Sequence, residues 1–108
     1  MTQNNNTKHT EKIIVHVDAE IEDLIPGFLE NMRKNVKTLE EALEKGDYET
    51  IQKLSHTMKG AGGGYGFDAI TDIGSSLESA AKEKNAQEIR RWLSEFSHYL
   101  EHVKIVYE

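Results

Sequence analysis

From Ile21 to Val103, hydrophobic residues recur at three- and four-residue steps, with charged and polar residues between them. This spacing is the period of an amphipathic α-helix, and it falls into four consecutive segments. Four such helices with short connections predict an all-α fold, an antiparallel, up-down-up-down four-helix bundle. The expected core positions of the four segments are Ile21, Leu24, Ile25, Phe28, Leu29, Met32, Val36, Leu39 and Leu43, then Ile51, Leu54, Met58, Ala61 and Tyr65, then Phe67, Ile70, Ile73, Leu77, Ala80 and Ala81, and finally Ile89, Trp92, Leu93, Phe96, Leu100 and Val103.

Capping and turn residues mark the boundaries between these segments. Gly46 is expected to end the first helix, and Asp47 can cap the second. Asn85, with Glu88 three residues later, is a capping-box-like start for the last helix. Pro26 lies early in the first segment, where it either kinks the helix or marks its true first turn.

The N-terminal residues differ from the rest of the chain. The opening MTQNNNTKHT is polar, and we expect residues 1–12 to be a disordered tail and residues 13–108 to form the bundle. The apolar run from Ile13 to Val17 is too short to classify by period. It is either an extended segment or a short helix that covers one end of the core, and no convincing alternating strand is found elsewhere.

The composition narrows the range of functions. A chain of 108 residues, 37% of them hydrophobic, suits one small domain, for which a monomer is the default. The formal net charge of −6 argues against nucleic acid as a partner, because such binding relies on Lys and Arg. An apolar run long enough for a membrane span is absent, as is a signal-peptide core, so a cytoplasmic location is expected. Without cysteine, the chain has no thiolate nucleophile or thiolate metal site.

The stretch HTMKGAGGGYG, residues 56–66, contains the most unusual chemistry. A phosphate-binding P-loop places its lysine directly after the glycines and follows a strand, whereas Lys59 precedes most of the glycines here. The helical interpretation fits better. At about 100° per residue, His56 lies about 140° from Ile51 and therefore on the solvent side of the second helix. Around His56 lie Gln52, Lys53, Lys59, Gly60 and Gly63.

Glycines inside a helix need an explanation, because each destabilises it by roughly 1 kcal/mol relative to alanine. Gly62 faces inward on the helical wheel, where it can let a neighbouring helix approach closely. Gly60 and Gly63 face outward and clear space around the imidazole for the surface of another macromolecule. Neutral histidine is nucleophilic near pH 7 and can carry a phosphoryl group. Lys59, one helical turn away, can offset the negative charge of that group.

These residues resemble a known motif. His56, Lys59, Gly60 and Gly66 are similar to the H-x-x-K-G motif, with a further glycine at +10, of histidine-containing phosphotransfer (HPt) domains. Leu77 followed by Glu78 resembles the L-E step of that family's next helix, and the resemblance covers about residues 15 to 108.

The resemblance implies a phosphoryl carrier rather than an enzyme. It implies that His56 accepts a phosphoryl group from an aspartate of a response-regulator receiver domain and passes it to another receiver. Lys59 would support the group electrostatically, and Gly60 and Gly63 would permit docking. The partner receiver would supply Mg²⁺ and most catalytic groups, the chain would need no cofactor of its own, and a sensor histidine kinase would act upstream.

Other interpretations stay open at this point. The domain could be phosphorylated directly by a histidine kinase, as in chemotaxis-type kinases, or it could be a purely structural bundle. It could also bind a metal, because His98 and His102 lie four residues apart on the last helix. That pair is expected to face solvent without an evident third ligand, so we predict no metal site.

Overall fold

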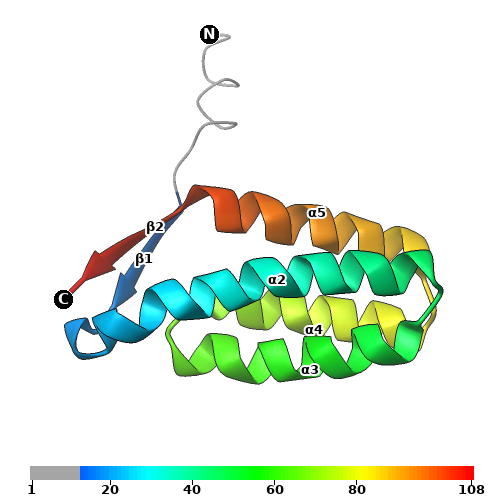
Figure 1. The fold of residues 1–108 in the computed structure, drawn as a ribbon, viewed down its shortest axis with the longest axis horizontal. Helices are drawn as coiled ribbons and strands as arrows, with labels where there is room; N and C mark the ends of the chain where they lie inside the picture. Colours follow the sequence, from blue (N-terminus) through cyan, green and yellow to red (C-terminus); the bar gives the residue numbers. More distant parts are fainter. Residues whose placement is uncertain (1–12) are drawn as a thin grey trace, which may run out of the picture.

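The computed structural model describes residues 13–108, and the expected disordered tail, residues 1–12, lies outside the described residues. Within the described residues, four α-helices form a bundle, and successive helices run in alternating directions (Figure 1). The predicted all-α four-helix fold is thus confirmed. In chain order, the elements are strand β1 (Ile13–Val17), the 3₁₀ helix η1 (Ala19–Leu24), α2 (Ile25–Glu44), α3 (Tyr48–Gly64), α4 (Asp68–Lys82), α5 (Ala86–His102) and strand β2 (Val103–Tyr107).

The first helix begins later than its hydrophobic pattern predicts. α2 starts at Ile25 rather than Ile21, because the preceding residues form the separate 3₁₀ helix η1. Pro26 lies in the first turn of α2. The backbone N–H groups of the first turn have no partner within the helix, so the N–H that proline lacks costs no helical hydrogen bond. Of the two roles predicted for this proline, it therefore marks the first turn.

The predicted boundaries of the next helices are confirmed. Gly46 has a φ of +68°, a left-handed conformation that glycine adopts readily just after a helix. The Asp47 carboxylate accepts a hydrogen bond from the backbone N–H of Thr50 at 3.1 Å. The Asn85 side chain likewise accepts one from the N–H of Glu88 at 3.1 Å. Each cap satisfies an N–H that the first turn of a helix leaves unpaired.

A small parallel sheet at one end of the bundle was not predicted (Figure 1). β1 pairs with β2 from Ile13 opposite Val103 to Val17 opposite Tyr107. The run at Ile13–Val17 is therefore extended, and Val103, expected on the last helix, begins a strand instead. The backbone turns at Val103 to φ −70° and ψ 136°, which ends the helix and starts extended structure. The sheet fastens the two ends of the described chain together without changing the fold class.

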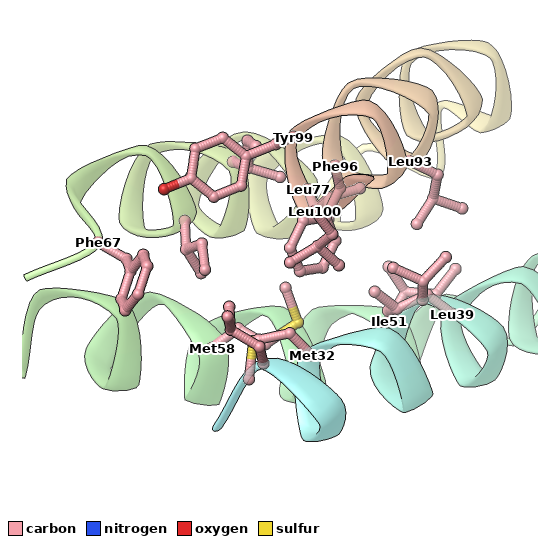
Figure 2. Close-up of a cluster of buried hydrophobic side chains, with 14 of the residues drawn as sticks. Met32, Leu39, Ile51, Met58, Phe67, Leu77, Leu93, Phe96, Tyr99 and Leu100 are labelled. Carbon is pink, nitrogen blue, oxygen red and sulfur yellow. The ribbon is translucent and has the colours of Figure 1, made fainter. Parts of the chain in front are cut away.

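The core fills the space between the four helices. Figure 2 shows its side chains, with Leu77, Phe96 and Leu100 directed toward Met32 and Met58. Several expected core residues are only half-buried and pack at its edge: Ile21, Leu43, Leu54, Ala61, Tyr65 and Trp92. The prediction of Leu24 as a core residue was wrong, because it ends η1 with 53% of its surface exposed. Among the buried residues, Ala42, Ser55, Gly74 and Tyr99 were not predicted. Ser55 is fully buried, and Tyr99 is 5% exposed, with burial raising the pKa of its hydroxyl to about 12.

Candidate functional site

The glycine-rich stretch is helical over most of its length. α3 continues from His56 through Gly60, Gly62 and Gly63 and ends at Gly64. Gly66 follows in the connection to α4 with a φ of +90°, a conformation that strains other residues. The helical interpretation of this stretch is therefore confirmed, and it contains no phosphate-binding loop between a strand and a helix.

One carboxylate from the neighbouring helix links the two predicted reactive residues. His56 lies on the solvent side of α3 as predicted, with its side chain 68% exposed. Its Nδ1 lies 3.0 Å from Oε2 of Glu78, a residue of α4. Lys59 Nζ lies 3.0 Å from the other oxygen of the same carboxylate, Oε1. The Glu78 side chain is only 13% exposed, so it reaches both partners from below the surface.

The charges of Lys59 and Glu78 determine which ring nitrogen of His56 carries a proton. The hydrogen bond from Lys59 is the main reason that the pKa of Glu78 lies below its ordinary value of 4.5. Burial opposes it and is the second-largest effect, and the hydrogen bond from His56 lowers the pKa further. Glu78 is therefore ionised near neutral pH and can only accept hydrogen bonds. Nδ1 of His56 must then carry a proton. In the neutral imidazole, the lone pair is on Nε2.

Small side chains leave the surface beside His56 open. A Cβ built at Gly60 would meet nothing within 4 Å, and one at Gly63 would meet only Thr71 Oγ1 at 3.4 Å. Both glycines are exposed, as predicted. At these two positions, α3 carries no side chain beside the imidazole.

The other two predicted docking residues lie beside the imidazole. Gln52 is half-buried, and Lys53 is exposed and pairs with Glu49 at 3.1 Å. Gln52, Lys53 and His56 help to line a shallow cleft of about 350 Å³ that Glu78 also lines. The structure thus brings Gln52 and Lys53 together with His56 around this cleft, whereas Lys59, Gly60 and Gly63 are not among the residues that line it.

The prediction for Gly62 is confirmed. It is buried, and a Cβ there would lie 3.0 Å from the Phe67 carbonyl oxygen and 3.0 Å from the Thr71 backbone nitrogen. α3 and the start of α4 approach too closely at this point for a larger residue.

The histidine pair on α5 has a different environment. The rings of His98 and His102 stack with centroids 4.2 Å apart. Nδ1 of His102 donates to the backbone carbonyl of His98 at 2.8 Å. Among residues 13–108, there is no group of three or more His, Cys, Asp or Glu side chains arranged to hold a metal ion.

Glu78 is the residue of the site to which the sequence assigned no role. It was noted only as part of the L-E step after Leu77, which is fully buried. Its position at the edge of the apolar stripe of α4 was a usable signal, because a carboxylate there can reach across to the adjacent helix. The sequence does not say which turn of α3 it reaches.

Comparison with known proteins places the chain in a family. No curated protein and no solved structure matched it. In the described part, no helix has the length and apolar character needed to cross a membrane. The family model described as the Hpt domain matches residues 23–104, a span that includes His56, Lys59 and Glu78. With most of its length matched by this model, and an exposed histidine on the second helix of a four-helix bundle, the chain belongs to the Hpt domain family.

Proposed function

We propose that this protein accepts a phosphoryl group on His56 from an aspartate of a receiver domain and passes it to another receiver. Hpt domains are phosphocarriers that work with histidine kinases and receiver domains in phosphorelays, so a histidine phosphotransfer role follows from family membership. The observation that carries the residue assignment is the exposed imidazole whose Nδ1 is held by the ionised carboxylate of Glu78.

The proposed transfer is a substitution at phosphorus. Nε2 of His56 attacks the phosphorus of the aspartyl phosphate, a P–N bond forms, and the P–O bond to the aspartate breaks. The aspartate leaves as a carboxylate, and the imidazole ring becomes cationic. The Nδ1–H bond to Glu78 stabilises that cation throughout, since a charge-assisted hydrogen bond is stronger than a neutral one. Transfer to the next receiver is the reverse of this step.

Lys59 has a supporting role in this proposal. Its Nζ lies on the carboxylate that also holds the imidazole, so it is close to the position that the phosphoryl group would take. The ammonium group offsets the added negative charge by an interaction that solvent partly screens. Mg²⁺ and the remaining catalytic groups would be supplied by the receiver, and the chain would hold no cofactor of its own.

The docking surface in this proposal is the patch of α3 formed by Gln52, Lys53, Gly60 and Gly63. The open space above Gly60 and Gly63 supports it, because a receiver must bring its aspartate within bonding distance of Nε2. A monomer in the cytoplasm stays our prediction for the working state.

The proposal is tested by incubating the protein with receiver domains labelled with ³²P on their aspartate. Label should move to the protein in a form that is labile to acid and stable to base, and a second, unlabelled receiver should remove it. A parallel reaction supplies a histidine kinase and ATP without any receiver. If the protein acquires label only in that reaction, it is phosphorylated directly by the kinase and not through a receiver. If it acquires label in neither reaction, the domain is a purely structural bundle.

A further inference from the structure

The backbone of Lys59 is held against α4 on two sides. Gly74 of α4 is buried, and a Cβ at this position would lie 3.0 Å from the Lys59 backbone nitrogen and 3.2 Å from its Cα. It would also lie 3.0 Å from the carbonyl oxygen of Ser55. Ser55 C=O and Lys59 N–H are the two ends of one helical hydrogen bond, and His56 lies in the turn that this bond closes.

Thr71 makes the second contact with the same residue. Its hydroxyl donates to the backbone carbonyl of Lys59 at 2.9 Å, across the interface between α3 and α4. The nitrogen, Cα and carbonyl oxygen of Lys59 therefore all lie against α4. Both contacts come from the α4 segment just before Glu78, and Gly74 lies about one helical turn, or about 6 Å along the helix axis, before Glu78.

Space, rather than backbone conformation, explains the glycine at this position. The glycines with a positive φ in the described part of the chain are Gly46 and Gly66. Gly74 lies inside α4, where alanine would be the better helix former. A methyl group at Gly74 would meet backbone atoms that cannot rotate away, so the neighbouring helix would have to move by a few tenths of an ångström.

We propose that Gly74 and Thr71 are positioning residues that seat the His56–Lys59 turn of α3 on α4, so that the single carboxylate of Glu78 reaches both side chains. This inference rests on the proposed function, and it deepens that function by identifying what fixes the imidazole. The two residues act through Glu78 and do not touch the phosphoryl group. A shift of the helices at Gly74 lengthens both 3.0 Å contacts of Glu78 together.

The test uses ¹⁵N NMR of the His56 imidazole together with the rate of phosphoryl uptake from a labelled receiver. In the wild-type protein, the Nδ1–H tautomer should dominate, and Glu78→Ala should give the mixture of a free histidine. Gly74→Ala should move the tautomer ratio part of the way toward that mixture, because a shift of a few tenths of an ångström weakens the 3.0 Å contact without abolishing it. It should slow uptake about three- to tenfold, since a misplacement of 1 Å costs up to about a hundredfold.

Leu93→Ala is the control for lost stability. Leu93 is buried on α5 and lies beside Leu43 of α2, so the cavity left by its truncation destabilises the fold without changing Gly74, Thr71 or Glu78. It should leave the tautomer ratio as in the wild type. A Gly74→Ala protein with the wild-type ratio and rate would overturn the proposal, as would equal tautomer changes in both variants.

A double variant separates positioning from general structural damage. If Gly74 acts through Glu78, then Gly74→Ala combined with Glu78→Ala should take up phosphate within about twofold of Glu78→Ala alone. If the double variant instead slows uptake by the product of the two single-variant effects, the two residues act independently and the proposal is contradicted. If Gly74→Ala fails to fold, Thr71→Val tests the same contact between α3 and α4 by removing the hydroxyl that bonds to the Lys59 carbonyl. It should shift the tautomer ratio in the same direction, and an unchanged ratio would overturn the inference.

These outcomes are distinct from failure of the proposed function. The tautomer ratio is measured without any receiver. It therefore tests the positioning of His56 even if none of the receivers used in the assay transfers phosphate. A wild-type protein that has the predicted tautomer but takes up no phosphate would refute the function and leave the positioning of His56 intact.

Discussion

Two helices of this bundle present histidines to solvent, and their surroundings differ. On α3, Nδ1 of His56 is held by a carboxylate of another helix, and that carboxylate also binds Lys59. On α5, His102 bonds to the backbone of its own helix and stacks on His98. Exposure alone therefore does not distinguish the proposed phosphoacceptor, His56, from the histidines of α5. The difference is that a second helix fixes the ring of His56 and leaves its other nitrogen free.

The flanks of the two sites differ as well. Beside His56, Gly60 and Gly63 leave the helix surface bare. Beside His98, the exposed positions one turn away carry Ser94 and Glu95. In the proposed docking, a partner approaches α3 where Gly60 and Gly63 carry no side chain, whereas the surface of α5 beside His98 carries side chains.

The largest effect should come from removing one of these histidines. His56→Gln should abolish phosphoryl uptake and leave helicity unchanged, because the side chain is exposed and its loss leaves no cavity. The double variant His98→Gln/His102→Gln should retain full uptake. Uptake is measured as label that is labile to acid and stable to base. Label that remains in His56→Gln would contradict the assignment of the phosphoryl group to α3 rather than α5.

The next largest effect on the transfer rate should come from filling the open surface at Gly63 of α3. Gly63→Leu should fold and slow transfer from a receiver by about tenfold or more, because the side chain occupies the docking surface. Ser94→Leu on α5 is the control and should transfer normally. Gly62→Leu should instead destabilise the fold by about 1–3 kcal/mol, since a Cβ there already meets backbone at 3.0 Å. Thermal melting and transfer rates of the three variants are compared, and normal transfer by Gly63→Leu would remove the docking argument.

The sequence predicts the parts of this molecule that depend on local patterns. The helices follow from their hydrophobic period, and the caps at Asp47 and Asn85 follow from residue type. The exposed position of His56 and the inward position of Gly62 follow from about 100° of rotation per residue. Ser55 also falls within the core arc of that wheel, but a polar residue is not expected there, and its burial was missed.

The features that the sequence missed depend on contacts between distant residues. β1 and β2 are five residues each and come from opposite ends of the described chain, so neither has enough alternation to be recognised alone. Glu78 meets His56 across 22 positions of sequence. That meeting depends on how closely α4 approaches α3 at Gly74, and no periodic pattern encodes an interhelical distance.

A smaller effect on rate is expected from the charge beside His56. Lys59→Ala should slow transfer about two- to fivefold, because a screened interaction of about 0.5–1 kcal/mol is lost. Arg91→Ala, which removes a positive charge from α5, should leave the rate unchanged. Transfer is followed at low salt, where screening is weakest. An unchanged rate in Lys59→Ala would assign Lys59 no part in the reaction.

The smallest effect is a shift in the titration of Glu78. Its pKa lies below the ordinary value of 4.5, so its bonds to His56 and Lys59 are complete above that pH and are lost as the pH falls through the lowered pKa. Since Lys59 is the larger cause, Lys59→Met should raise the titration midpoint more than His56→Gln does.

Lys53→Met is the control for that titration, because Lys53 pairs with Glu49 rather than with Glu78. It should leave the Glu78 midpoint where it is. Carboxyl ¹³C shifts report the midpoint in each protein, and a midpoint above 4.5 in the wild type would contradict the bridge between the two helices.

The most direct test of this account identifies the nitrogen that carries the phosphoryl group. The protein, labelled with ¹⁵N in its histidines, is phosphorylated by a receiver and examined by NMR for coupling between ³¹P and the ring nitrogens. Because Glu78 holds the Nδ1–H of His56, we predict that phosphorus is bonded to Nε2 of His56 and that Nδ1 keeps its proton. Phosphorus on Nδ1 of His56, or on either histidine of α5, would contradict the account.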